Sequence, residues 1–296
     1  MKFRHSRKEI SRIILHLLLL CRGCNFLSFN RGVETLKRKR LICFLVIAII
    51  SALSFSCHAE ESYGKKFYRS LSKRLGKNRA DYPKLTDEEF ANFRMVKTSG
   101  IAQGKLFRSS SPVSTWSERY KFSDNAIKNA GVKTIINLAD SDEKMRKHEG
   151  YSGSYYSRQN IICLNLGMKY KSRDFRRRLA NGIHFMAVNE PPYLIHCSLG
   201  KDRAGFVCAL VECLMGATWP EIAGDYMLSF YNYFGIVPGS GEYNFVLKNE
   251  IYSFLCAAFG VERLEGINLS DGAERYFLGI GVSSQDIETL RRKLGD

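Results

Sequence analysis

Across the middle of the chain, the apolar positions switch repeatedly between strand-like and helix-like patterns. Short runs rich in β-branched and aromatic residues predict four strands, at residues 105–108, 132–138, 161–166 and 193–195. Helix-like segments separate most of these runs. Strands that alternate with helices predict an α/β fold, in which a central, largely parallel sheet is flanked by helices on both faces.

The helix-like segments carry boundary signals. Ser123 or Asp124 is expected to cap a helix that continues to Ala130, where Gly131 ends it. The segment after the third strand has apolar residues three or four positions apart, which is typical of one buried helix face: Phe175, Leu179, Ile183 and Met186. These two helices would link the predicted strands in the sheet.

The chain after the last predicted strand is expected to be mostly helical. Residues 204–215 form a continuous apolar helix pattern, and the segment from Trp219 onward is also helix-like. Ser283 and Asp286 make a candidate capping box for a final helix over residues 285–294. The last strand therefore leads into a short loop and a helix, the arrangement that phosphate-binding loops use.

The first 59 residues hold most of the positive charge and have the features of an export signal. The formal net charge is +16, and residues 1–59 contribute eleven Lys or Arg and two Glu, which leaves +7 for the remainder. A basic cluster at residues 37–40 precedes an uncharged apolar run of 15 residues, 41–55. That run is shorter than the roughly 20 residues that span a bilayer. We therefore expect an exported protein, and the resemblance of this segment to bacterial signals implies a periplasmic or membrane-anchored location in a bacterium.

Cys57 leaves two modes of export open. The segment resembles a bacterial lipoprotein signal, in which Cys57 would be lipidated and anchor the protein to a membrane, although Ser54 stands where that pattern prefers Leu. Cleavage as an ordinary signal peptide is the alternative. Residues 1–32 fit no signal-peptide pattern, which also leaves open a translation start near Val33.

Residues 60–85 are basic and turn-rich, and we expect a tether with little fixed structure there, ahead of a folded domain at 86–296. Because more than half of the positive excess lies in the extension, nucleic acid is not an expected partner, whereas the remaining +7 favours an anionic ligand. Of the nine cysteines, four beyond the extension lie in apolar runs typical of buried free thiols: Cys163, Cys208, Cys213 and Cys256.

The remaining cysteine lies in the loop after the last predicted strand, in the sequence His196-Cys197-Ser198-Leu199-Gly200-Lys201-Asp202-Arg203-Ala204-Gly205. Five residues separate Cys197 from Arg203, a length that wraps a tight loop so that its N–H groups and the following helix N-terminus face one point. Such a loop binds an oxyanion. We expect Ser198 to Lys201, with Ala204 and Gly205, to line a phosphate site to which Arg203 adds bidentate contacts.

Cys197 is the expected nucleophile. The loop N–H groups and the helix N-terminus favour its thiolate, which can attack phosphorus in line and form a phosphocysteine intermediate without a metal or another cofactor. His196 is expected to support the loop. Lys201 is expected either to contact a second phosphate or to be a solvated charge.

The leaving group needs a proton donor. Asp202 is the first candidate, Asp174 the second and Asp140 the third. Each has a structural alternative, since Asp202 could hold Arg203 in place and Asp174 could cap its helix.

These residues resemble the signature of the protein tyrosine phosphatase superfamily, which is His-Cys, five residues, Arg, a hydroxyl or small residue, and Gly. The Gly-Lys-Asp-Arg sequence at 200–203 is similar to the atypical bacterial tyrosine or dual-specificity branch, whose members act on phosphotyrosine and in some cases on phosphoinositides or phosphoserine. The resemblance spans about residue 90 to the end and implies the cysteine phosphatase fold. Further matches lie at residues 92–94, 106–110, 131–140, 225–229 and 276–294.

Two positions depart from the family pattern. Ala204 stands where a hydroxyl residue commonly assists breakdown of the phosphocysteine, which implies slow turnover. In the better-known members the general acid follows the strand before the loop helix, where this chain has no carboxylate at residues 165–168. That absence is the reason for favouring Asp202.

Three functions remain open from the sequence. The first is a metal-independent phosphomonoester hydrolase that acts on phosphotyrosine proteins. The second is a phosphoinositide or inositol phosphate phosphatase, suggested by Lys201 and the arginines within residues 173–178. The third is a weakly active phosphate-binding module, suggested by Ala204 and the missing carboxylate.

Overall fold

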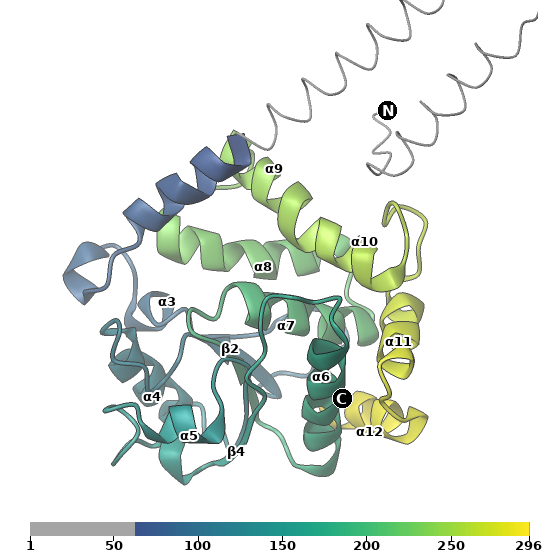
Figure 1. Cartoon of the computed structure of the whole chain (residues 1–296), viewed down its shortest axis with the longest axis horizontal. Helices are drawn as coiled ribbons and strands as arrows, with labels where there is room; N and C mark the ends of the chain where they lie inside the picture. The colour runs from purple at the N-terminus through teal and green to yellow at the C-terminus, as the bar shows by residue number, and fades with distance from the viewer. Residues whose placement is uncertain (1–62, 296) are drawn as a thin grey trace, which may run out of the picture. The chain divides into compact units, whose positions relative to one another are not determined.

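The computed structural model describes residues 63–295 (Figure 1). The expected export signal, including Cys57 and the apolar run at 41–55, lies outside the described residues. Within residues 63–295, no helix has the length and apolar character needed to cross a membrane. The chain divides into two units between Ser70 and Leu71, and the second unit contains the whole sheet.

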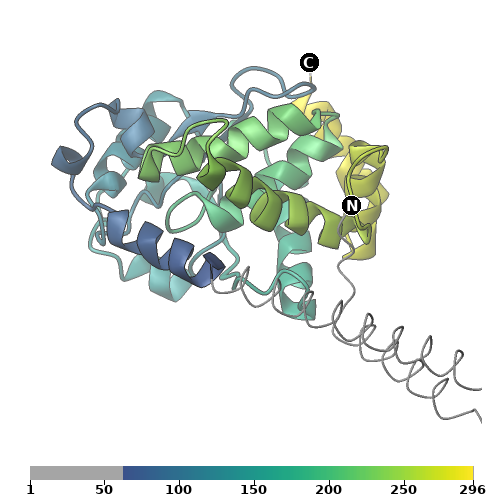
Figure 2. The ribbon, with the colours of Figure 1, turned by 90° about the horizontal axis from the view of Figure 1, so that it is seen from above.

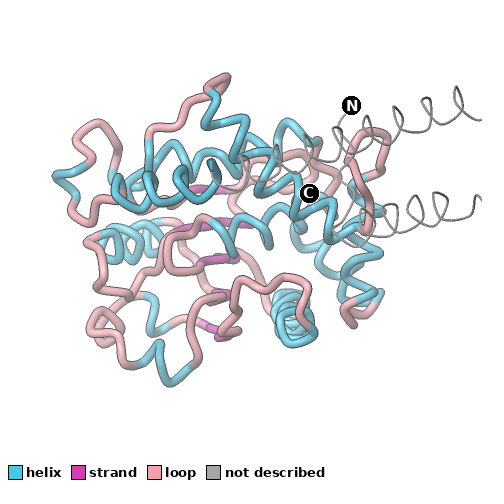
Figure 3. The backbone as a smooth tube through the Cα atoms, turned by 45° about the horizontal axis from the view of Figure 1, so that its top comes forward, coloured by secondary structure: helices cyan, strands magenta, loops and turns pink. Residues whose placement is uncertain are grey.

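The sheet has five strands in the order β1-β2-β5-β3-β4, and Figure 3 shows them side by side with helices around them. The strands are β1 (Arg94–Met95), β2 (Leu106–Ser109), β3 (Thr134–Asn137), β4 (Asn160–Cys163) and β5 (Tyr193–His196). β1 runs antiparallel to β2, and all other neighbours are parallel, which confirms the predicted sheet. β5 lies at the centre, so its carboxyl end opens at the middle of the edge where ligands bind in such sheets.

Helices form most of the remainder of the second unit. Before β5 these are η1 (Arg79–Asp81), α3 (Asp87–Phe90), α4 (Arg119–Asn129), α5 (Asp142–Arg146), η2 (Tyr156–Arg158) and α6 (Arg173–Val188). After β5 they are α7 (Asp202–Leu214), α8 (Trp219–Phe234), α9 (Gly241–Leu247), the π-helical η3 (Lys248–Tyr252), α10 (Ser253–Phe259), α11 (Leu269–Gly279) and α12 (Ser284–Leu294). Figures 1 and 2 show α11 and α12 at the opposite end of the unit from α4.

Helices cover both faces of the sheet. On one face, Phe107, Ile135 and Leu194 of three adjacent strands pack with Ile127 of α4 and Met145 of α5. Successive strand residues point to opposite faces, so the neighbouring positions face α6 and α7. This two-sided burial explains why the strands read as continuous apolar runs in the sequence.

α4 begins earlier than predicted, at Arg119, because that side chain is buried and fixes the first turn. The Arg119 guanidinium lies 4.1 to 4.4 Å from the centroids of three aromatic rings, those of Tyr82, Phe90 and Tyr233. Ser123 Oγ donates to the Ser110 carbonyl (3.0 Å), and Asp124 accepts from two N–H groups at the start of η2 (2.8 and 3.0 Å). The predicted capping role of Ser123 and Asp124 is therefore wrong, since both tie α4 to neighbouring loops.

The expectation of little fixed structure at residues 60–85 is also wrong for its described part. Residues 63–74 are helical, and η1 follows. The Lys77 ammonium lies 4.8 Å from the centroid of the Trp116 ring, and the Lys77 carbonyl accepts from Ser117 Oγ (2.8 Å). These partners lie about 40 positions further along the chain, so the local composition did not indicate them.

The other helix boundaries lie close to their predicted positions. α7 starts at Asp202, two residues earlier than expected. α6 is capped by Ser172, whose Oγ accepts from the Phe175 N–H (3.2 Å), so Asp174 is not the cap. Ser283 caps α12 as predicted, whereas the Asp286 carboxylate lies 3.1 Å from the His184 ring nitrogen.

Candidate active site

The sheet places Cys197 at the carboxyl end of its central strand. Cys197 directly follows β5, is 2% exposed, and is separated from α7 by residues 198–201. The first residues of α7 are Asp202 and Arg203. Every residue predicted to line the phosphate site therefore lies in this loop or in the first turn of α7.

All four carbonyl groups of residues 198–201 accept hydrogen bonds from groups outside the loop. The Ser198 carbonyl accepts from the Ser111 N–H, and the Leu199 carbonyl accepts from Asn92 Nδ2 and Tyr233 Oη. The Gly200 and Lys201 carbonyls both accept from Arg108 Nη2. These distances range from 2.7 to 3.2 Å. The N–H groups of residues 198–203 meet no acceptor in the described part of the chain. With carbonyls held outward and N–H groups open, the loop is a nest for an anion.

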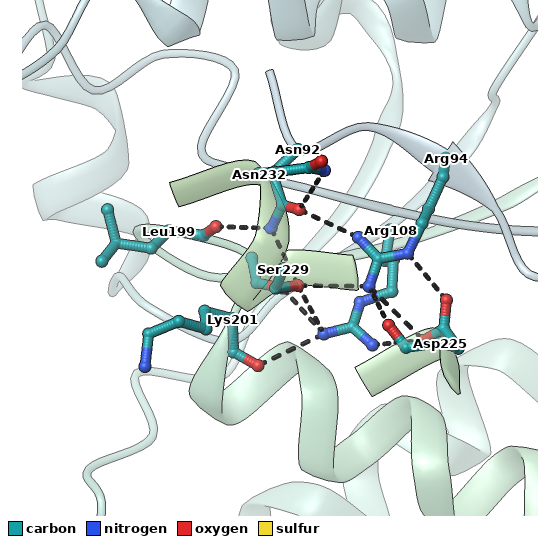
Figure 4. Close-up of polar contacts among 9 residues, drawn as sticks. Asn92, Arg94, Arg108, Leu199, Lys201, Asp225, Ser229 and Asn232 are labelled. Carbon is teal, nitrogen blue, oxygen red and sulfur yellow. Dashed lines mark hydrogen bonds and ion pairs between the residues drawn. The ribbon is translucent and has the colours of Figure 1, made fainter. Parts of the chain in front are cut away.

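Two of these carbonyls, those of Gly200 and Lys201, depend on a buried ion cluster formed by Arg94, Arg108 and Asp225 (Figure 4). Arg108 of β2 is fully buried and pairs with Asp225 of α8, whose other oxygen lies 2.7 Å from Arg94 Nε. Burial alone would raise the pKa of Asp225, but the two arginines lower it to about 2. The carboxylate thus stays charged and orients the guanidinium that holds the loop.

Polar side chains extend this cluster to the loop (Figure 4). Asn92 Nδ2 donates to the Leu199 carbonyl and to Ser229 Oγ (3.2 Å), and Asn92 Oδ1 accepts from Arg94 and Asn232 (2.9 and 3.2 Å). Sequence analysis had assigned the residues of this cluster no role beyond a family match at 92–94, 106–110 and 225–229, and none at all to Asn232. A usable signal was present, because charged residues inside an apolar strand and an apolar helix face must find opposite charges.

Gly200 is required by the loop backbone. Its φ of +66° lies in the left-handed region, and a Cβ there would lie 2.1 Å from the Ser109 carbonyl oxygen. A Cβ at Gly205 would lie 2.6 Å from the Tyr226 ring and 2.9 Å from Arg108 Nη2. Both glycines let the loop and α7 approach the elements that hold them.

For the phosphoryl chemistry predicted from the sequence, Gly200→Ala is expected to lower turnover about 100-fold, because the added methyl group moves the loop N–H groups away from the expected phosphoryl position. Gly224→Ala is the matched control, since Gly224 is exposed in α8 and a Cβ there meets nothing within 4 Å. The control should keep full turnover and gain about 0.5–1 kcal/mol of stability. Steady-state kinetics and thermal unfolding of both variants test this; equal turnover would contradict the role of Gly200.

Arg203 lies at the edge of the nest. Its Nη1 donates to the Leu166 carbonyl and its Nη2 to Ser198 Oγ, both at 3.0 Å. A guanidinium has five N–H donors, so three remain for a ligand. These contacts fix the plane of the guanidinium in front of the loop, where it can grip two oxygens of one phosphoryl group.

His196 is buried under the loop. Its Nε2 lies 2.9 Å from Tyr156 Oη, which also accepts from Asn137 Nδ2 (3.1 Å). Burial lowers the pKa of His196 to about 4, so the ring is neutral and its Nδ1–H can donate to the Cys197 carbonyl at 3.3 Å. His196 thus connects the cysteine backbone to β3 through Tyr156.

A comparison of the sequence with known families shows to which family the chain belongs. A sequence model described as the tyrosine phosphatase family matches residues 89–296, which include the loop, its holding cluster and all five strands. The chain belongs to the tyrosine phosphatase family. This confirms the resemblance that the loop indicated.

Individual relatives of this tyrosine phosphatase family member are distant. A tyrosine-protein phosphatase of Nostoc commune is 28% identical over a region that covers 34% of this chain and 38% of the relative, so the chain spans well under half of that protein. The core catalytic domain of the PP-IP phosphatase SIW14 from S. cerevisiae, solved with citrate, has 15% identity and a TM-score of 0.34, covering 54% of this chain and 85% of that one. P. aeruginosa TpbA, solved as a cysteine-to-serine variant with pTyr, has 16% identity and a TM-score of 0.32, covering 50% and 88%.

The second and third candidates for the general acid, Asp174 and Asp140, each form contacts away from the loop. Asp174 is 57% exposed and pairs with Arg178 and Arg177 (2.8 and 3.0 Å), which lower its pKa. Asp140 is buried; burial alone would raise its pKa, but Lys144 at 2.7 Å and Asn137 lower it. Asp174 lies on α6 and Asp140 follows β3, so neither belongs to the loop or to the first turn of α7.

Asp202 is paired with Lys201 at the start of α7. The Lys201 side chain is buried, with its ammonium 4.2 Å from the centroid of the Phe230 ring. Burial alone would lower the pKa of Lys201, but Asp202 and Glu250 raise it. The ammonium is thus engaged inside the domain, while 29% of the Asp202 side chain remains exposed.

The other cysteines of the described residues lie apart from this chemistry. Cys163, Cys208, Cys213 and Cys256 are free thiols, and burial raises the pKa of each. Between residues 63 and 295, no group of three or more His, Cys, Asp or Glu side chains could hold a metal ion.

Proposed function

We propose that this protein is a metal-independent phosphomonoester hydrolase that acts on phosphotyrosine proteins through a phosphocysteine intermediate. The observation that carries the proposal is the nest of open N–H groups beside Cys197, with Arg203 at its edge. Membership of the tyrosine phosphatase family supports the same chemistry.

The proposed reaction has two steps. The nest and Arg203 bind the phosphoryl oxygens, and Cys197 Sγ attacks phosphorus as the bond to the tyrosine oxygen breaks. Asp202 gives its proton to the departing phenolate. Water then attacks the phosphocysteine, Asp202 takes up a proton from it, and inorganic phosphate and the thiolate are released.

Asp202 is proposed as the acid because it is next to Arg203 at the start of α7 and partly exposed, whereas Asp174 lies on α6 and Asp140 follows β3. Asp202→Asn should lower kcat about 100-fold or more for phosphotyrosine, whose leaving group needs a proton. The loss should be much smaller for p-nitrophenyl phosphate, whose leaving group departs as an anion. Equal losses for both substrates would instead indicate that Asp202 only supports the loop through its ion pair with Lys201.

The proposed function is tested by phosphate release from p-nitrophenyl phosphate and a phosphotyrosine peptide, with chelator present. We expect hydrolysis of both that the chelator does not affect. Turnover of inositol phosphates should be measured in the same assay, because the arginines at residues 173–178 favoured an inositol phosphate phosphatase as the alternative. Turnover of phosphoserine peptides should be measured as well. Tight binding of the phosphotyrosine peptide without turnover would favour the phosphate-binding module.

Export belongs to the same proposal and rests on the sequence of residues 33–59. The mature protein is proposed to be periplasmic or anchored through a lipidated Cys57. Mass spectrometry of its N-terminal peptide distinguishes cleavage alone from lipidation.

A further inference from the structure

A cavity of about 540 Å³ lies at the start of α6 and is not used by the chemistry above. Helices α7, α10 and α11 and the segment before α6 supply its walls, which are mostly apolar: Met168, Tyr170, Phe206, Phe254, Ala257 and Tyr276. Three cationic side chains also line it, those of Lys169, Lys171 and Arg176. A cavity of this size and composition is typical of a ligand-binding pocket.

The cavity adjoins the phosphate nest. Phe206 lies three residues after Arg203 on α7, which places the two side chains on neighbouring turns of one helix face. The Tyr170 ring lies 4.7 Å from the Phe206 ring, centroid to centroid. Leu166, whose carbonyl accepts from Arg203, is two residues before Met168. A group attached to a phosphoryl in the nest can therefore reach this pocket.

Tyr276 contributes a further aromatic wall. Its side chain is 7% exposed, and its hydroxyl oxygen is covered by the protein, so the ring and not the hydroxyl faces the cavity.

We infer that this pocket binds a large apolar side chain adjacent to the phosphotyrosine of a peptide substrate that also carries acidic residues. The inference rests on the proposed function and names its substrate class. Aromatic walls match an apolar side chain, and the three cations at residues 169, 171 and 176 match acidic neighbours.

An inositol phosphate fits the same place poorly. Its scissile phosphate is attached to a ring covered with hydroxyl and further phosphate groups. Lys169, Lys171 and Arg176 could pair with its further phosphate groups, but its hydroxyl-covered ring would lie against the Tyr170, Phe206 and Phe254 rings, which offer few hydrogen-bond partners. Polar groups buried without partners weaken binding.

Ala257→Trp tests the inference, because Ala257 is exposed on α10 and an indole there would fill the cavity without disturbing the core. The substrates are acidic phosphotyrosine peptides with Leu or Ala next to the phosphotyrosine, on either side. We expect the kcat/KM of wild type to be about 10-fold higher for one of the Leu peptides than for the matching Ala peptide, because burial of a Leu side chain strengthens binding by this order. The difference should lie mainly in KM. The variant should lose this preference and keep full turnover of p-nitrophenyl phosphate.

The matched control is Leu278→Trp, which adds the same indole on α11 at a position outside the cavity and should leave the preference unchanged. Lys169→Glu should raise KM for the acidic peptide and not for p-nitrophenyl phosphate. The inference would be overturned if Ala257→Trp kept the Leu preference of wild type. It would also be overturned if Ala257→Trp lost turnover of inositol phosphates but not of the Leu peptide. Absence of p-nitrophenyl phosphate turnover in wild type would instead refute the proposed function.

Discussion

Cys197→Ser is expected to lower hydrolysis of p-nitrophenyl phosphate about 1,000-fold or more, because a serine hydroxyl in the same nest is a far weaker nucleophile. The nest itself should survive, since its carbonyls are held by Asn92, Arg108 and Tyr233 rather than by the cysteine. The variant should therefore still bind a phosphotyrosine peptide, which titration calorimetry can measure.

Cys163→Ser is the control for this prediction. Cys163 is half-buried in β4, and burial raises its pKa to about 12, so it remains a neutral thiol at neutral pH. Its replacement should leave turnover close to that of wild type. If Cys197→Ser hydrolysed the substrate at the wild-type rate while Cys163→Ser did not, the nucleophile would be assigned to the wrong residue.

The phosphate loop could be predicted from the sequence because all of its parts are contiguous. Residues 196–205 contain the nucleophile, the arginine and the glycines, and the strand before them has a clear apolar pattern. The parallel sheet followed from the same alternation of strands and helices. In both cases the information lies within a few residues, where backbone propensity and side-chain spacing act directly.

The support of the loop could not be predicted in the same way. Arg108 holds the Gly200 and Lys201 carbonyls only because β2 lies beside β5 in the sheet, 92 positions away in sequence. Asp225 of α8 meets Arg108 although the two residues are 117 positions apart in sequence. Such contacts are set by topology, so a sequence pattern shows buried charges without showing their partners. The same reason explains the wrong expectation for residues 60–85.

The buried ion cluster has a consequence for catalysis. Removing one partner from a buried ion pair leaves the other charge uncompensated, which destabilises a protein by about 3–5 kcal/mol. Asp225 satisfies both Arg94 and Arg108, and Arg108 in turn holds two loop carbonyls. The cost of breaking this arrangement keeps the loop N–H groups aimed at one point before any ligand arrives. Preorganised donors of this kind contribute strongly to transition-state stabilisation.

Arg203→Lys is expected to lower kcat about 100- to 1,000-fold although the charge is kept. The planar guanidinium uses two N–H groups to hold the Leu166 carbonyl and Ser198 Oγ, and it presents the others to the phosphoryl oxygens. A lysine ammonium cannot make both sets of contacts at once. The loss should therefore appear in kcat, where the equatorial oxygens carry the transition-state charge, more than in KM.

Arg178→Lys is the matched control, because Arg178 also donates to a backbone carbonyl, that of Leu164 at 3.3 Å, and pairs with Asp174 on the protein surface. Its replacement should change kcat by no more than about twofold, as expected for a surface substitution. Single-turnover and steady-state kinetics of both variants with p-nitrophenyl phosphate provide the comparison. Comparable kcat values for the two variants would show that charge alone, and not the forked geometry of Arg203, stabilises the transition state.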